Sequence, residues 1–162
     1  MRIGIVSDSH GDQAHVKAAL RLMAERGVSL IVHCGDIDDA ATASLFDGTT
    51  THFVLGNCDV DIAEIKVAAA RAGGLLHGRF AELVLAGRRI AVLHGDDPPR
   101  LQETIGSGDY DYVFYGHTHV PGDRLVGKTW VINPGALHRA RPKTALVLDL
   151  PTGKRDWLRV AE

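Results

Sequence analysis

The first half of the chain alternates short apolar runs with segments whose apolar residues recur at helical spacing. The runs predict buried strands at residues 3–6, 30–32 and 52–55. A helix is predicted after each strand, and the first two helices begin at the capping residues Asp12 and Asp38. Right-handed crossovers make the three strands parallel, so the loops that follow them meet at one edge of a sheet.

The second half has the pattern of strands joined by turns. A hairpin is predicted at residues 80–85 and 89–93, and a short helix begins at Asp97-Pro98-Pro99. Further strands are predicted at residues 112–115, 124–126, 129–132 and 144–150, with a weaker edge strand at 155–160. The pattern indicates one α/β domain over residues 1–162, parallel in its first half and mainly antiparallel in its second.

Composition narrows the class of protein. Of the 162 residues, 45% are hydrophobic and 23% charged, as in soluble globular proteins. A net charge of -2 gives no general attraction to nucleic acids or membranes. Cys34 and Cys58 form neither a disulfide framework nor a CxxC pair, which favours a reducing compartment. No apolar run approaches the ~18 residues of a membrane span, and Asp8 interrupts the apolar start. We therefore expect a cytoplasmic protein without a signal peptide.

Asp8 and His10 follow the first predicted strand. Side chains two apart on a strand point the same way, so the two would be aimed together. A carboxylate and an imidazole aimed together form half of a metal site. Taken alone, the pair is a weak signal, and an aspartate that caps a turn beside a surface histidine is the simpler interpretation. Four later stretches that offer similar ligands at strand ends favour the metal site.

Seven side chains that can bind metal ions follow five of the predicted strands, and glycines lie beside several of them. Ligands bind beyond the carboxyl ends of strands in open α/β sheets, so these side chains would converge on one crevice. Their number suits two ions about 3.5–4 Å apart that share a bridging carboxylate. They are Asp8, His10, Asp36, Asn57, His94, His117 and His119.

Other polar residues have simpler interpretations. Cys34 is predicted to be a buried structural thiol. The basic loop that contains Arg139 is either a solvated loop or a source of cations that meet an incoming phosphate. The remaining histidines are predicted to be ordinary surface or hydrogen-bonded residues: His15, His33, His52, His77 and His138.

The ordered motifs resemble those of the calcineurin-like metallophosphoesterases. They are Asp8-Ser9-His10, Gly35-Asp36, Gly56-Asn57-Cys58-Asp59, His94-Gly95 and Gly116-His117-Thr118-His119. With the later Asn133-Pro134-Gly135, the short chain is similar to the small, uncapped bacterial and archaeal phosphodiesterases. The resemblance implies a four-layer αββα sandwich, in which two mixed β-sheets pack face to face with helices outside.

The resemblance also implies an assignment for two divalent metal ions. The first ion would be held by Asp8, His10 and His119. The second would be held by Asn57, His94 and His117, and Asp36 would bridge the two. Mixed oxygen and nitrogen ligands suit Mn²⁺, with Ni, Fe, Co or Zn as alternatives. The implied reaction is hydrolysis of a small phosphodiester, in which a metal-bound hydroxide attacks phosphorus opposite the leaving oxygen.

Two positions depart from the wider family. Cys58 stands where relatives have a histidine that assists the leaving group, and a thiol is a weaker hydrogen-bond donor. Asp96 stands where many have a second histidine, and at the rim its charge would disfavour a highly anionic substrate.

Three alternative functions stay open. The chain could be a phosphomonoesterase or a nuclease of the same superfamily. A nuclease would show a basic, aromatic groove or an added domain, and the sequence indicates neither. It could also be a non-catalytic scaffold on this fold, which an incomplete ligand set would favour, whereas all seven ligands are present. Binding to a membrane is not expected, and a homo-oligomer is compatible with the sequence.

Overall fold

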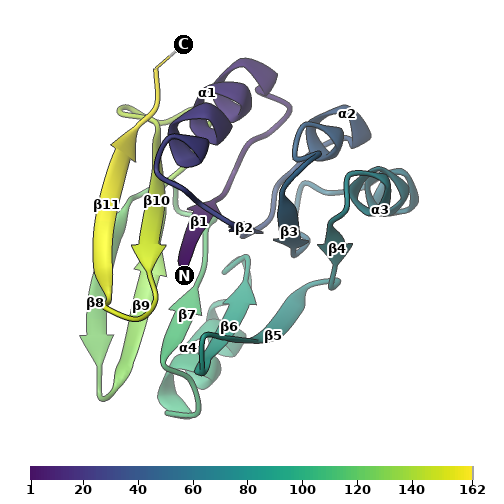
Figure 1. Ribbon diagram of the computed structural model, residues 1–162. Helices are drawn as coiled ribbons and strands as arrows, with labels where there is room; N and C mark the ends of the chain where they lie inside the picture. The colour runs from purple at the N-terminus through teal and green to yellow at the C-terminus, as the bar shows by residue number, and fades with distance from the viewer. Residues whose placement is uncertain (162) are drawn as a thin grey trace.

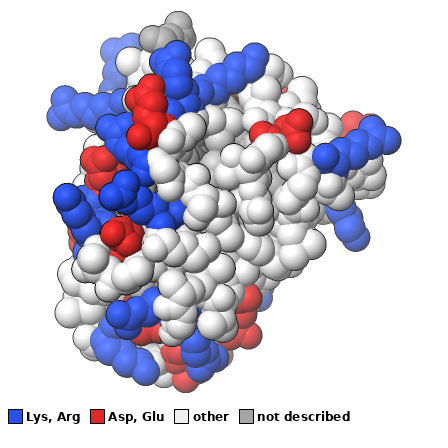
Figure 2. Space-filling model, viewed as in Figure 1, with Lys and Arg blue, Asp and Glu red and all other residues white. Residues whose placement is uncertain are grey.

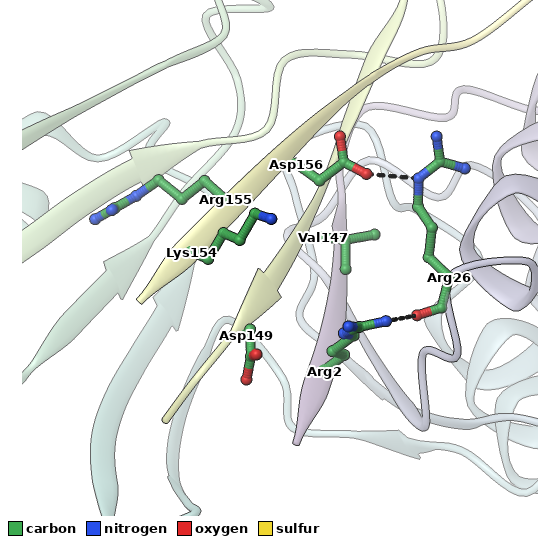
Figure 3. A pocket seen from close by; sticks show the side chains of 7 residues that line it. All are labelled: Arg2, Arg26, Val147, Asp149, Lys154, Arg155 and Asp156. Atoms are coloured by element: carbon green, nitrogen blue, oxygen red, sulfur yellow. Dashed lines mark hydrogen bonds and ion pairs between the residues drawn. The ribbon is translucent and has the colours of Figure 1, made fainter. Parts of the chain in front are cut away.

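The strands of the computed structural model, which describes residues 1–161, form two sheets (Figure 1). The first sheet contains β1 (Arg2–Val6), β2 (Leu30–His33), β3 (Thr50–Phe53), β4 (Leu75–Leu76), β10 (Thr144–Asp149) and β11 (Lys154–Arg159). Its order is β11-β10-β1-β2-β3-β4. The second sheet contains β5 (Phe80–Leu85), β6 (Arg88–Leu93), β7 (Tyr112–Phe114), β8 (Gly122–Val126) and β9 (Thr129–Asn133). Its order is β5-β6-β7-β9-β8.

The two sheets pack face to face. Ile3 and Ile5 of β1 lie in the same buried cluster as Ile90 of β6, Phe114 of β7 and Ile132 of β9. Each strand has period two, so alternate side chains of β1 enter this inner core while the others face the helices. At Gly4 a Cβ would meet the sulfur of Met23, so the glycine lets the first helix pack closely on β1.

Helices cover both outer faces. The first sheet carries α1 (Gln13–Ala24), α2 (Ala40–Ser44) and α3 (Ile62–Arg71), and the second carries α4 (Pro98–Gly106) (Figure 1). Leu101 and Ile105 of α4 pack in one cluster with Val113 and Val131 of the second sheet. This arrangement confirms the predicted αββα sandwich. Within residues 1–161, none of the helices has the length and apolar character needed to cross a membrane.

Both sheets are mixed, as expected. β1, β2, β3 and β4 pair in parallel, and β10 adds to β1 in the antiparallel direction, with β11 as the edge strand. In the second sheet β5–β6 and β8–β9 are antiparallel, whereas β6–β7 and β7–β9 are parallel. The strands of the second half that lead to the site therefore run parallel, because α4 forms a crossover between β6 and β7.

Several predicted boundaries were wrong by a few residues. β3 spans Thr50–Phe53 rather than residues 52–55, and the two-residue strand β4 was missed because it is too short to show a pattern. The cap of α2 is Asp39 and not Asp38, since its side chain accepts the Thr42 N–H at 2.7 Å. The hairpin between β5 and β6 is confirmed, with positive φ at both turn residues, Ala86 and Gly87.

Candidate metal centre

The predicted ligands come together where the carboxyl ends of β1 and β2 in the first sheet meet those of β6 and β7 in the second. Backbone hydrogen bonds join the loops in pairs. Within the first sheet, Asp8 N–H donates to Gly35 O at 3.0 Å, and His10 N–H donates to Asp36 O at 3.1 Å. Within the second, Gly116 N–H donates to His94 O at 2.9 Å. Across the sheets, His117 N–H donates to the Asp8 carboxylate at 3.1 Å.

The reason why these side chains converge differs from the one predicted. β1 ends at Val6 and β7 at Phe114, so Asp8 and the Gly-His-Thr-His segment lie beyond the strands, and the period-two argument was wrong. Left-handed backbone aims the side chains instead, at a cost of about 1–3 kcal/mol for each residue. The φ values are 52° at Asp8, 41° at His10, 56° at Asp36, 66° at His117 and 59° at His119.

Asp8, His10 and His119 form the first group of candidate ligands. Their nearest ligand atoms all lie within 4.8 Å of one another. The Nε2 of His119 is 3.2 Å from Asp8 Oδ1, and that of His10 is 3.9 Å from it. Asp8 is fully buried, and its Oδ1 has no hydrogen-bond partner within the described residues. A buried, unpartnered carboxylate oxygen that faces imidazole nitrogens fits a divalent cation.

His94 joins Asp8 and Asp36 in a second group of ligand atoms within 4.8 Å. Its Nδ1 lies 2.8 Å from the carbonyl oxygen of Cys34, which can only accept a hydrogen bond. Nδ1 therefore carries the hydrogen, and Nε2 faces Asp36 Oδ2 at 3.2 Å. Burial lowers the pKa of His94, but the nearby carboxylates of Asp36 and Asp8 outweigh this effect and raise it. The site thus attracts positive charge.

Asp36 occupies the position between the two groups. Its Oδ2 lies 3.5 Å from His10 Nε2 and 3.2 Å from His94 Nε2, while its Oδ1 accepts the Cys58 N–H at 2.9 Å. Burial alone would raise the pKa of Asp36. The adjacent His94, the N–H of Cys58 and the ring of His10 together hold that pKa well below its usual range. Asp36 is therefore an ionised carboxylate placed to touch both groups.

Asn57 and His117 lie beside this cluster, and both are exposed. The ring of His117 is 5.2 Å from that of His94, centroid to centroid. The amide of Asn57 lies 3.4 Å from the Cys58 sulfur. The structure thus brings five of the seven predicted side chains into the close groups and places these two next to them.

Cys58 lies among the candidate ligand atoms, whereas Arg139 lies at the rim of the site. The sulfur of Cys58 is within 4.8 Å of ligand atoms of His10 and Asp36. Burial and the charge of Asp36 raise the pKa of this thiol to about 11, so it is protonated at neutral pH without metal ions. Arg139 is exposed, and its neighbour His138 donates its N–H to Asp8 O at 3.1 Å. This hydrogen bond places Arg139 on a loop at the rim. Cys34 and Cys58 are both free thiols.

Asp59 joins two loops of the site, a role that was not predicted from the sequence. Its carboxylate accepts N–H groups from Asp36 at 3.0 Å, Ile37 at 2.8 Å, Asp38 at 2.8 Å and Gly56 at 2.7 Å. It therefore clamps the loops after β2 and β3 together. A lone aspartate in a loop has no periodic signal, and only its place in Gly-Asn-Cys-Asp could have indicated it.

The predicted effect of Asp96 on anionic substrates needs correction. Asp96 forms an ion pair with Arg79, which also donates to Gly56 O at 3.3 Å. The negative charge is therefore compensated by a neighbouring cation. The pair instead ties the loop after β6 to the loop that carries Asn57.

Comparisons with known proteins identify the family and the fold of the chain. A family model described as the calcineurin-like phosphoesterase superfamily domain matches residues 1–153. Phosphodiesterase MJ0936 of Methanocaldococcus jannaschii is 28% identical over 139 residues, which cover 83% of each protein. Phosphodiesterase YfcE of Escherichia coli K12 is 25% identical over 161 residues, covering 85% of this chain and 79% of YfcE. The solved structure of an archaeal phosphodiesterase has a TM-score of 0.92 at 26% identity, covering 98% of this chain and 99% of that one.

Glycine at position 56 allows the Asp36 loop to approach closely, since a Cβ there would meet the carboxylate and backbone nitrogen of Asp36. We expect Gly56→Ala to lower the free energy of unfolding by about 1–3 kcal/mol through overpacking, and to weaken cation binding by displacing Asp36. Urea denaturation and metal titration would measure both effects. Gly106→Ala is the control, because no atom lies within 4 Å of a Cβ in α4. Equal stability of the two variants would contradict the close approach.

Proposed function

The chain belongs to the calcineurin-like phosphoesterase superfamily, and on this basis we propose that it is a binuclear metal-dependent phosphodiesterase. The observation that carries the proposal is the buried, unpartnered Oδ1 of Asp8, which faces the Nε2 atoms of His10, His94 and His119 at 3.2–3.9 Å. A carboxylate buried in this way destabilises a fold unless a cation compensates it. The relatives named as phosphodiesterases favour a diester as substrate.

We assign the first cation to Asp8, His10 and His119, and the second to Asn57, His94 and His117. Asp36 would contribute to holding both, and its short distances to His10 and His94 support this assignment. The Asp8–His119 and Asp36–His94 distances are those of groups that a shared cation would draw together. Oxygen and imidazole nitrogen donors suit Mn²⁺, and Ni, Fe, Co or Zn would also be accepted.

Two divalent cations bound there would polarise the phosphoryl oxygens and lower the pKa of water near neutrality. The chain supplies the remaining functions. The amide of Asn57 and the guanidinium of Arg139 bind oxygens of the small phosphoester substrate. Cys58 would stand near the leaving oxygen, and its thiol is protonated because burial and the charge of Asp36 raise its pKa to about 11.

Residues outside the ligand set hold this geometry. The Cys34 carbonyl fixes the tautomer of His94, and Asp59 fixes the loop that carries Asp36. In this way the chain orients its ligands before substrate arrives.

A non-catalytic scaffold explains the site less well. Protein binding by an outer surface would not require buried carboxylates that face imidazole nitrogens between two sheets. Such a protein could replace Asp8 with an apolar residue and gain stability. The buried Asp8 therefore favours an enzyme.

The two-cation assignment predicts a stoichiometry. Metal-free protein titrated with Mn²⁺ should bind about two ions per chain. Asp36→Asn should lower the affinity for both ions because the shared negative charge is lost. His10→Ala should mainly lower the affinity for the first ion. Elemental analysis and calorimetry would measure this. Saturation at one ion, with Asp36→Asn unaffected, would exclude the binuclear site.

The proposed activity predicts a substrate preference. Mn²⁺-loaded protein should hydrolyse bis(4-nitrophenyl) phosphate faster than 4-nitrophenyl phosphate, and Asp36→Asn should remove both activities. Release of nitrophenolate would be followed by its visible absorbance. Faster hydrolysis of the monoester would instead identify a phosphomonoesterase, and no hydrolysis of either ester by the loaded protein would favour the scaffold.

The role of Cys58 predicts a dependence on the leaving group. A general acid contributes about 10²–10⁴-fold when the leaving alkoxide is poor, and a thiol should contribute less. Cys58→His should therefore raise kcat/KM mainly on alkyl esters and leave metal content unchanged. Cys58→Ala should change hydrolysis of the nitrophenyl diester little. Equal changes on good and poor leaving groups would show that position 58 supplies no acid.

A further inference from the structure

His138 lies against the proposed first cation site, although its sequence context indicated an ordinary histidine. It follows β9, and its N–H donates to Asp8 O at 3.1 Å. The preceding Leu137 N–H donates to Ser7 O at 3.2 Å. These hydrogen bonds attach the loop backbone to the segment that carries Asp8.

Asp12 holds the side chain of His138. Its Oδ2 lies 3.3 Å from His138 Nδ1, while its Oδ1 lies 2.8 Å from His15 Nδ1 and accepts the His15 N–H at the start of α1. Asp12 is thus held by a helix terminus and contacts two imidazoles at once. The orientation of His138 is therefore determined by an element outside the metal site.

The ring of His138 packs against His10. Their centroids are 5.7 Å apart at an interplanar angle of 55°, and the ring of His10 also contacts His119, with centroids 5.6 Å apart. The chain Asp12–His138–His10 therefore connects the start of α1 to a proposed ligand through side-chain contacts.

His10 needs such support more than His94 does. A histidine that binds a metal ion normally donates its other ring N–H to a fixed acceptor. His94 has this acceptor in the carbonyl of Cys34. For His10, no hydrogen-bond partner of Nδ1 lies within residues 1–161, and its backbone has a left-handed φ of 41°. The carboxylates of Asp36 and Asp8 face only its Nε2, so the rings of His138 and His119 support the rest of this imidazole.

We propose that His138, oriented by Asp12, is a positioning residue that holds His10 in place for the first cation. The inference rests on the proposed function, because it assigns His10 to a cation. The inference predicts that loss of the His138 ring lowers the affinity for one cation and leaves the affinity for the other unchanged. Replacing a residue needed only for folding would lower the affinity for both cations and the stability of the fold together.

The test compares three substitutions by calorimetric titration of metal-free protein with Mn²⁺. His138→Ala removes the ring, His138→Asn keeps a polar group near Asp12, and His138→Phe keeps a ring of similar size. His52→Ala is the control, since it removes an imidazole that is hydrogen-bonded to His77 rather than packed against a proposed ligand. The His52 Nδ1 and His77 Nε2 atoms are 2.8 Å apart. Thermal unfolding of each metal-free variant would report the stability of the fold.

We expect His138→Ala and His138→Asn to lower the affinity for one Mn²⁺ ion by ~10-fold or more. The affinity for the other ion should fall by less than ~2-fold. His138→Phe should restore part of the affinity that His138→Ala loses, because it keeps a ring beside His10 but loses the hydrogen bond to Asp12. His52→Ala should match the wild type. Unchanged affinity in His138→Ala, equal weakening of both ions, or no recovery in His138→Phe would overturn the inference alone. A wild type that binds no Mn²⁺ would overturn the proposed function as well.

Discussion

Two carboxylates are buried where the two sheets meet, and the structure around them is arranged to tolerate this charge. Asp8 is fully buried and Asp36 nearly so, and both face imidazole nitrogens at 3.2–3.9 Å. An ionised carboxylate in such a place is costly unless cations or hydrogen-bond donors surround it. Backbone N–H groups of Cys58 and His117 supply part of this compensation. The oxygen that remains unpartnered, Oδ1 of Asp8, faces the space where we propose cations bind.

The backbone strain at the site has the same origin. Residues with left-handed φ cluster among the proposed ligands, and such strain persists only where the surrounding structure holds it. Here the apolar core between the sheets is buried, and the loops are joined by hydrogen bonds from one strand end to the next. Asp59 adds a four-bond clamp, and Arg79 with Asp96 adds an ion pair at the rim. The sandwich thus keeps the ligands in position before any ion arrives.

The candidate ligands and the residues around them have different supports in the fold. The candidate ligands lie on the segments that directly follow strands, and the sheet order brings these strand ends together. Cys58, Arg139 and His138 lie on the loops around them, where substitution changes the surroundings of a substrate without moving a strand.

The sequence alone determined the strand–helix order, the two mixed sheets implied by the family motifs, and the seven candidate ligands. Apolar runs and glycine-flanked polar residues are local signals, and the ordered motifs are specific as a set. It could not determine how the ligands are aimed, because left-handed φ values at Asp8 and His10 arise from loop contacts and not from strand period. Nor could it reveal that Asp59 clamps two loops or that Asp12, predicted only as a helix cap, also contacts His138, because these partners meet only in the folded chain. Contacts between residues far apart in sequence are decided by the packing of the two sheets, and these contacts set the geometry of the site.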